Sequence, residues 1–156
     1  MEAYTVSMLG VLALCLMSVL LAIYSGASKG RAGALSGPVL PLDDGNLLYR
    51  IDRAHLNSVE ALAPFVVPAV LAMLVGASPT VLAVLVWLHV AIRLAHLAVY
   101  LRGGNAAKGG SLRTVLYVCG AIVAAVLIVV TGVKISDVGR VKQVHVVVLT
   151  GRVGML

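Results

Sequence analysis

The chain has 156 residues, of which 61% are hydrophobic and 12% are charged, and its mean hydropathy is +1.07. An average soluble domain is about 45–50% apolar and about 25% charged, so this composition excludes an ordinary soluble protein, and it also excludes disordered, collagen-like and disulfide-rich chains. The net charge of +6 does not indicate a nucleic-acid partner, because the basic residues lie mostly between and after apolar segments, where they set topology and meet anionic headgroups or an anionic ligand.

The first predicted element is a membrane-spanning helix at residues 5–24. A hydrocarbon core about 30 Å thick needs about 20 helical residues, and this segment is long enough and uncharged. A signal peptide is the competing interpretation. We favour a retained helix, because the preceding residues include Glu2 and no Lys or Arg.

Three further helices are predicted between residues 56 and 133. The apolar stretch 61–101 is too long for one span, and the sequence Gly76-Ala-Ser-Pro79 divides it at a tight turn. This gives helices at about 56–75 and 80–101, and a fourth at 112–133 follows a Gly-rich loop at 102–110. We therefore expect an all-α integral membrane domain, a four-transmembrane-helix bundle, over residues 1–134.

The tail, residues 135–156, is assigned no function. Its β-branched segment 144–149 is too short to span a membrane. An edge strand, a packed extension and a vector-derived end all remain open for it.

The basic residues orient the predicted helices. Seven of them lie in two loops on the same side of the membrane, and four lie in the tail on the other side. The seven are Lys29, Arg31, Arg50, Arg53, Arg102, Lys108 and Arg113, and the four are Lys134, Arg140, Lys142 and Arg152. By the positive-inside tendency both basic loops face the cytoplasm. We expect a multi-pass integral membrane protein whose active site faces the cytoplasm, and for a bacterial source the membrane would be the cell inner membrane.

Polar residues enter three of the predicted spans at helical spacing. Ionisable side chains within a span are costly and usually face the bundle interior, so each suggests a functional site. The candidates are Arg53, His55, Asn57 and Glu60 on the second helix, Arg93, His96 and Tyr100 on the third, and Arg113 and Tyr117 on the fourth. All lie toward the basic loops and can converge there. Each of these residues taken alone also has a structural explanation: arginines that snorkel to the headgroups, tyrosines of an aromatic belt, or histidines of the core. These explanations account least well for Glu60 and Arg93.

A metal site is not expected. His55, His96 and Glu60 offer two histidines and one carboxylate, but no helix carries a pair of histidines four residues apart. The sequence also lacks a phosphate-binding loop and a catalytic triad with supporting spacing.

Three motifs carry a family resemblance. They read Arg53-Ala-His-Leu-Asn57-x-x-Glu60 followed by Pro64-Phe65, Arg93-x-x-His96-x-x-x-Tyr100-Leu101, and Arg113-x-x-x-Tyr117. In order, spacing and span count they resemble the MAPEG family, the membrane-associated proteins of eicosanoid and glutathione metabolism, over residues 5–133. The segment Ala-His-Leu-Asn is closest to the microsomal glutathione S-transferase branch, because the prostaglandin E synthase branch has a basic residue at the position of Leu56.

The resemblance implies a homotrimer that binds glutathione as cosubstrate between adjacent subunits at the cytoplasmic side. It implies that Arg113 is the catalytic residue and stabilises the glutathione thiolate. The glutathione-binding positions would be Lys29, which matches less closely, Arg53, His55, Asn57, Glu60, Arg93, His96, Tyr100 and Tyr117.

The residue chemistry agrees with this expectation. Glutathione carries two carboxylates, an amine and a thiol, so its pocket should combine several arginines with a carboxylate. A guanidinium stabilises the thiolate, which is the nucleophile. A hydrophobic electrophile would arrive from the membrane lipid, and conjugation, with peroxide reduction as an added activity, needs that electrophile beside the sulfur. A small proton- or ion-coupled transporter and a non-catalytic membrane scaffold remain the alternatives.

Overall fold

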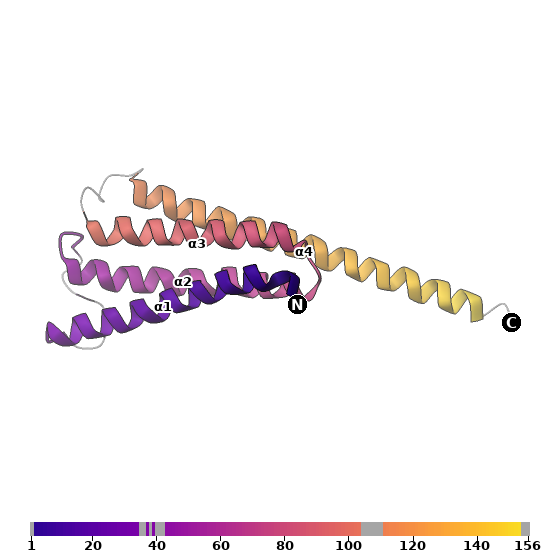
Figure 1. The fold of residues 1–156 in the computed structure, drawn as a ribbon, viewed down its shortest axis with the longest axis horizontal. Coiled ribbons are helices and arrows are strands. Elements are labelled where there is room, and N and C mark those ends of the chain that lie inside the picture. Colours follow the sequence, from indigo (N-terminus) through magenta and orange to yellow (C-terminus); the bar gives the residue numbers. More distant parts are fainter. Residues whose placement is uncertain (1, 35–36, 38, 40–42, 104–110, 154–156) are drawn as a thin grey trace.

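The protein is a bundle of four long helices (Figure 1). The computed structural model describes residues 2–34, 37, 39, 43–103 and 111–153, with side chains up to residue 140. A short 3-10 helix, η1 (Glu2–Tyr4), leads into α1 (Thr5–Arg31), and α2 (Leu47–Leu74), α3 (Pro79–Arg102) and α4 (Leu112–Val153) follow. Each of the four α-helices is long and apolar enough to cross a membrane. The prediction of an all-helical membrane protein with four transmembrane helices is confirmed.

The helices α1 and α2 extend further toward the basic loops than the predicted spans at 5–24 and 56–75. The C-terminal end of α1 is stabilised by Lys29 and Arg31 in its last turn, because positive charges interact favourably with the helix dipole there. The start of α2 is set by Asn46, whose side-chain oxygen accepts a hydrogen bond from the backbone N–H of Leu48 at 2.9 Å. Hydropathy marks only the part of a helix that lies in lipid. The prediction therefore ended α1 too early and began α2 too late.

The turn between α2 and α3 was predicted closely. Gly76 has φ of 71°, a conformation that favours glycine, and Pro79 occupies the first turn of α3, where no backbone donor is required. Gly103, also at φ 71°, ends α3. The rest of the Gly-rich loop, including Lys108, lies outside the described residues.

The tail is helical rather than extended. We expected the fourth helix to end at 133, but α4 continues to Val153 over 42 residues. At about 1.5 Å per residue this helix is about 60 Å long, twice the hydrocarbon thickness, and it projects past the other helices (Figure 1). The edge-strand interpretation of 144–149 is wrong, because a strand needs a neighbouring strand to bond with and the described chain forms helices there.

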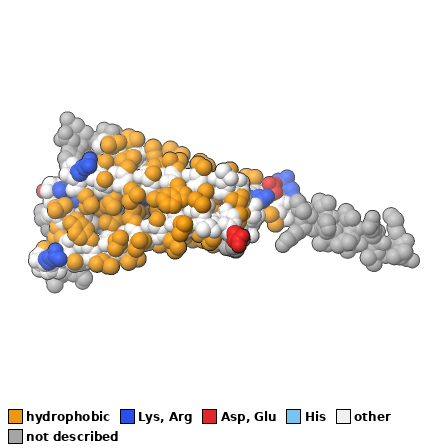
Figure 2. Space-filling view, in the orientation of Figure 1, with side chains coloured by type: hydrophobic (Ala, Val, Ile, Leu, Met, Phe, Trp, Pro, Cys, Tyr) orange, Lys and Arg blue, Asp and Glu red, His pale blue; other side chains and the backbone are white. Residues whose placement is uncertain are grey.

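The core lies where α2 and α3 pack against each other and against the two outer helices. Helix α1 contacts α2 and α3 on one side, and α4 contacts the same two helices on the other. Phe65, Val86 and Leu127 are fully buried. Gly10 lets α1 approach α3 closely, because a Cβ atom there would collide with Val86. Apolar side chains cover most of the face of the bundle drawn in Figure 2, and large apolar side chains are exposed on all four helices, as expected of a surface that meets lipid.

One end of the bundle gathers the basic loops. The end of α1, the start of α2, the end of α3 and the start of α4 meet there (Figure 1). We call it the basic end, and its cationic residues are Lys29, Arg31, Arg50, Arg53, Arg102 and Arg113.

Candidate active site

A pocket of about 140 Å³ lies among α2, α3 and α4, around the middle of α2 and α3, and we call it the polar pocket. Its polar residues are Asn57, Glu60, His89, Arg93 and Tyr117, and its other lining residues are small, namely Ala61, Pro64, Gly120, Ala121 and Ala124. Four of the predicted site residues, from three different helices, therefore surround one space. The convergence that the helical spacing predicted is present.

Arg93 is a buried charged residue of the polar pocket. Only 5% of this residue is exposed, whereas Glu60 and Tyr117 lie on exposed surfaces of the single chain. Its Nη2 atom donates a hydrogen bond of 2.7 Å to the backbone oxygen of Asn57. A hydrogen-bonded guanidinium at this position joins α3 to α2 and stabilises the wall of the pocket.

A cluster of aromatic rings links the polar pocket to Arg113. The ring of His96 lies 6.3 Å from the ring of Tyr117 and 5.6 Å from the ring of Tyr100, in tilted arrangements. The guanidinium carbon of Arg113 lies 4.6 Å from the centroid of the Tyr100 ring, within cation–π range. Arg113 thus stands at the outer edge of the same site, at the start of α4.

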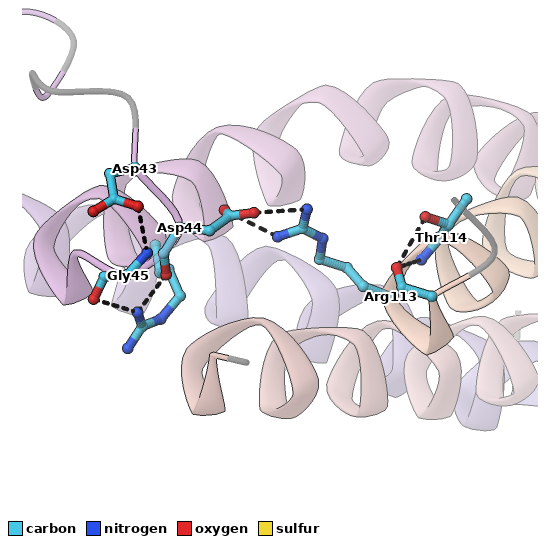
Figure 3. A network of polar contacts seen from close by, with 7 residues as sticks. Asp43, Asp44, Gly45, Arg113 and Thr114 are labelled. Carbon is cyan, nitrogen blue, oxygen red and sulfur yellow. Dashed lines mark hydrogen bonds and ion pairs between the residues drawn. The ribbon is translucent and has the colours of Figure 1, made fainter. Parts of the chain in front are cut away.

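Asp44 is the polar partner of Arg113, and the sequence analysis missed it. Its two carboxylate oxygens accept hydrogen bonds of 3.1 and 3.2 Å from the two terminal nitrogens of Arg113, the bidentate geometry that suits a guanidinium (Figure 3). Arg50 secures the segment by donating to the backbone oxygens of Asp44 and Gly45 at 2.6 and 3.0 Å. The available signal was the acidic pair Asp43-Asp44 before the helix cap, at the same end as the arginines.

Lys29 and His55 lie in a different place from the other predicted site residues. Both line a second groove, between α1 and α2, together with Ser25. Lys29 forms an ion pair with Asp52, which is 4% exposed and also accepts a hydrogen bond from the Ser25 hydroxyl at 3.2 Å. Asp52 and His55 are three residues apart and share one face of α2, which separates them from Asn57 and Glu60. A single chain does not bring all ten predicted residues together.

Arg53 is the last of the predicted glutathione-binding residues. It is partly buried and precedes Asn57 by one turn on α2, so it lies on the same helical face toward the basic end. Within the described residues, no group of three or more His, Cys, Asp or Glu side chains is placed to hold a metal ion. His55 in particular lies in the second groove, whereas Glu60 lines the polar pocket.

The chain matches a known protein family. A model of the MAPEG family matches residues 3–133, which include all four transmembrane helices as far as the middle of α4. No curated protein matches the chain.

Proposed function

The chain belongs to the MAPEG family of integral membrane proteins, and from this membership and the geometry around Arg113 we propose that it is a membrane-bound glutathione transferase. In this proposal the enzyme binds glutathione, holds its thiol as the thiolate and conjugates it to a hydrophobic electrophile that arrives from the lipid. The family also contains related enzymes, and the microsomal glutathione S-transferase branch, with glutathione peroxidase activity in addition, is the assignment that the residues support.

The observation that carries the proposal is the placement of Arg113 at the end of the aromatic cluster that adjoins the polar pocket. The pocket offers a buried guanidinium, Arg93, and a carboxylate, Glu60, which match the carboxylates and the amine of the tripeptide. Arg113 lies at the basic end, where it can face a sulfur atom near the membrane boundary. A thiol with an ordinary pKa of about 8.5 is mostly protonated at neutral pH, and a nearby guanidinium favours the thiolate.

Binding and turnover test the proposal together. We expect glutathione to raise the thermal unfolding midpoint of the detergent-solubilised protein and a generic electrophile to be conjugated in its presence. A transporter of protons or ions would not conjugate the electrophile. A non-catalytic scaffold would bind glutathione without turnover. Absence of both binding and turnover would contradict the proposal.

A homotrimer would bring the two separate groups of predicted residues together in one site shared between subunits. Lys29 and His55 face the second groove, whereas Glu60 and Arg93 face the polar pocket. In a trimer, the second groove of one subunit can adjoin the polar pocket of the next, so that one glutathione contacts both. We expect native mass spectrometry in mild detergent to show three chains. A monomer that still binds glutathione would rule out a site shared between subunits.

We also propose that the basic end faces the cytoplasm, where glutathione is available. The cationic side chains at this end satisfy the positive-inside tendency. They would also meet anionic lipid headgroups at the membrane surface.

Asp44 is expected to moderate the charge of Arg113. In an Asp44→Asn variant the guanidinium loses a neutralising carboxylate but keeps one acceptor, so bound glutathione should form its thiolate at a lower pH. Coulomb attraction at a partly exposed site is worth about 1 kcal/mol, which corresponds to a shift of less than about one pH unit. The measurement is an ultraviolet thiolate titration of the glutathione complex. Asp43→Asn is the matched control, because the Asp43 carboxylate accepts from the Gly45 backbone instead; equal shifts in both variants would remove Asp44 from this role.

A further inference from the structure

A small cavity in the middle of the bundle lies on the opposite side of Arg93 from α4. It lies among α1, α2 and α3 and leaves about 10 Å³ of space that a water-sized sphere can reach. One bound water needs about 10–15 Å³ measured in this way. Half of its eight lining residues are polar, namely Ser18, Ser58, His89 and Arg93. We call it the central cavity.

Two of these polar side chains are buried without a partner. Ser18 is 6% exposed and His89 is 2% exposed, and neither Ser18 Oγ nor His89 Nδ1 has a hydrogen-bond partner within the described part of the chain. The imidazole is held in place by the Phe65 ring, on which it stacks at 3.9 Å with an angle of 7°. An unpaired polar group is costly inside a membrane, where no bulk water can reach it.

We propose that the central cavity binds one water molecule, held between Ser18 of α1 and His89 of α3. A water can donate a hydrogen bond to Nδ1 of a neutral imidazole and accept one from the Ser18 hydroxyl. Two further partners line the cavity. Ser58 Oγ donates to the His55 backbone oxygen and keeps its lone pairs available, and Arg93 has N–H donors beyond the one that binds Asn57. Buried waters typically make about three hydrogen bonds, and this cavity supplies that number.

The water would support Arg93 on the side that faces α1. Arg93 lines both the central cavity and the polar pocket. A water bonded to α1 and α3 therefore fixes the helix that carries this guanidinium, on the side away from the polar pocket. This inference concerns the bundle interior and does not depend on whether the protein acts on glutathione.

The sign of a stability change tests the water site. Removing a hydroxyl that a water satisfies destabilises a protein, whereas removing an unsatisfied hydroxyl is neutral or stabilising. We expect Ser18→Ala to lower the thermal unfolding midpoint of the full chain in detergent by about 2–4 °C. Ser7→Ala is the matched control, because Ser7 Oγ is also buried and unpaired but lines none of the cavities described above. An unchanged or raised midpoint in Ser18→Ala would show that the cavity is dry.

A spectroscopic measurement gives an independent answer. In protein labelled with ¹⁵N at histidine, the Nδ1 signal of His89 is identified by its loss in His89→Phe. We expect the Nδ1 chemical shift of a nitrogen that accepts a hydrogen bond, and we expect this shift to change in Ser18→Ala but not in Ser7→Ala. A wild-type Nδ1 shift typical of a free lone pair would overturn the proposal.

Discussion

Replacing Arg113 by alanine is expected to raise the pH at which bound glutathione becomes a thiolate and to reduce turnover strongly. An opposite charge within about 4–6 Å shifts a titrating group by about 1–3 pH units. Loss of the guanidinium would therefore lower the thiolate fraction near neutral pH by about ten- to a thousandfold, and the rate would follow. Glutathione binding should fall less, because Arg93 and Arg53 remain for the carboxylates.

The measurement pairs an ultraviolet thiolate titration of the glutathione complex with steady-state rates. Arg113→Lys should recover part of the effect, because a positive charge remains while the planar fork that binds Asp44 is lost. Arg102→Ala is the control for charge alone, since Arg102 is an exposed cation at the same end of the bundle. Equal thiolate absorbance at neutral pH in the wild type and in Arg113→Ala would remove Arg113 from catalysis and leave Tyr117 or Arg53 as the candidate.

The spans and the convergence of the polar stripes could be predicted from the sequence because both follow from local periodicity. An uncharged segment of about 20 residues must form a helix in lipid, where each backbone group needs an internal partner. Residues three, four or seven apart share a helical face, so the spacing alone places Asn57 and Glu60 on one face of their helix, and Arg93 and His96 on one face of theirs. The polar pocket and the adjoining aromatic rings bring these faces together.

The remaining features depend on contacts between distant segments, which local periodicity does not encode. Asp44 lies 69 residues from Arg113 in a connecting segment, and nothing within that segment reveals its partner. The separation of Lys29 from the polar pocket arises because the buried carboxylate of Asp52 binds it on the α1 side of α2. The full length of α4 could not be predicted because its last part is rich in valine, a residue that is common in strands. The strand preference of valine depends on context, and a single such segment has no neighbouring strand to pair with.

Glu60 provides the second large expected effect. Its carboxylate lines the polar pocket opposite the small residues of α4, and within the described chain it forms no ion pair. A carboxylate that lies in a membrane span and forms no ion pair with the described residues is suited to an amine supplied by a ligand. Glu60→Gln keeps the shape of the side chain and removes its charge. The loss of a charge-assisted hydrogen bond costs about 1.5–3 kcal/mol, so glutathione affinity should fall by about ten- to a hundredfold.

The ionisation of the bound thiol should change much less in Glu60→Gln than in Arg113→Ala, because Glu60 lies near the middle of α2 (Leu47–Leu74), whereas Arg113 lies at the start of α4, at the edge of the site. The two variants therefore separate binding from activation when affinity, by calorimetry or thermal shift, is measured beside the thiolate titration. Glu2→Gln removes the same charge at the opposite end of the bundle and should leave the affinity for glutathione unchanged. A folded Glu60→Gln variant with wild-type affinity would assign Glu60 to the structure of the bundle, and the ligand amine would then need another acceptor at the basic end, for which Asp44 is the nearest carboxylate to Arg113.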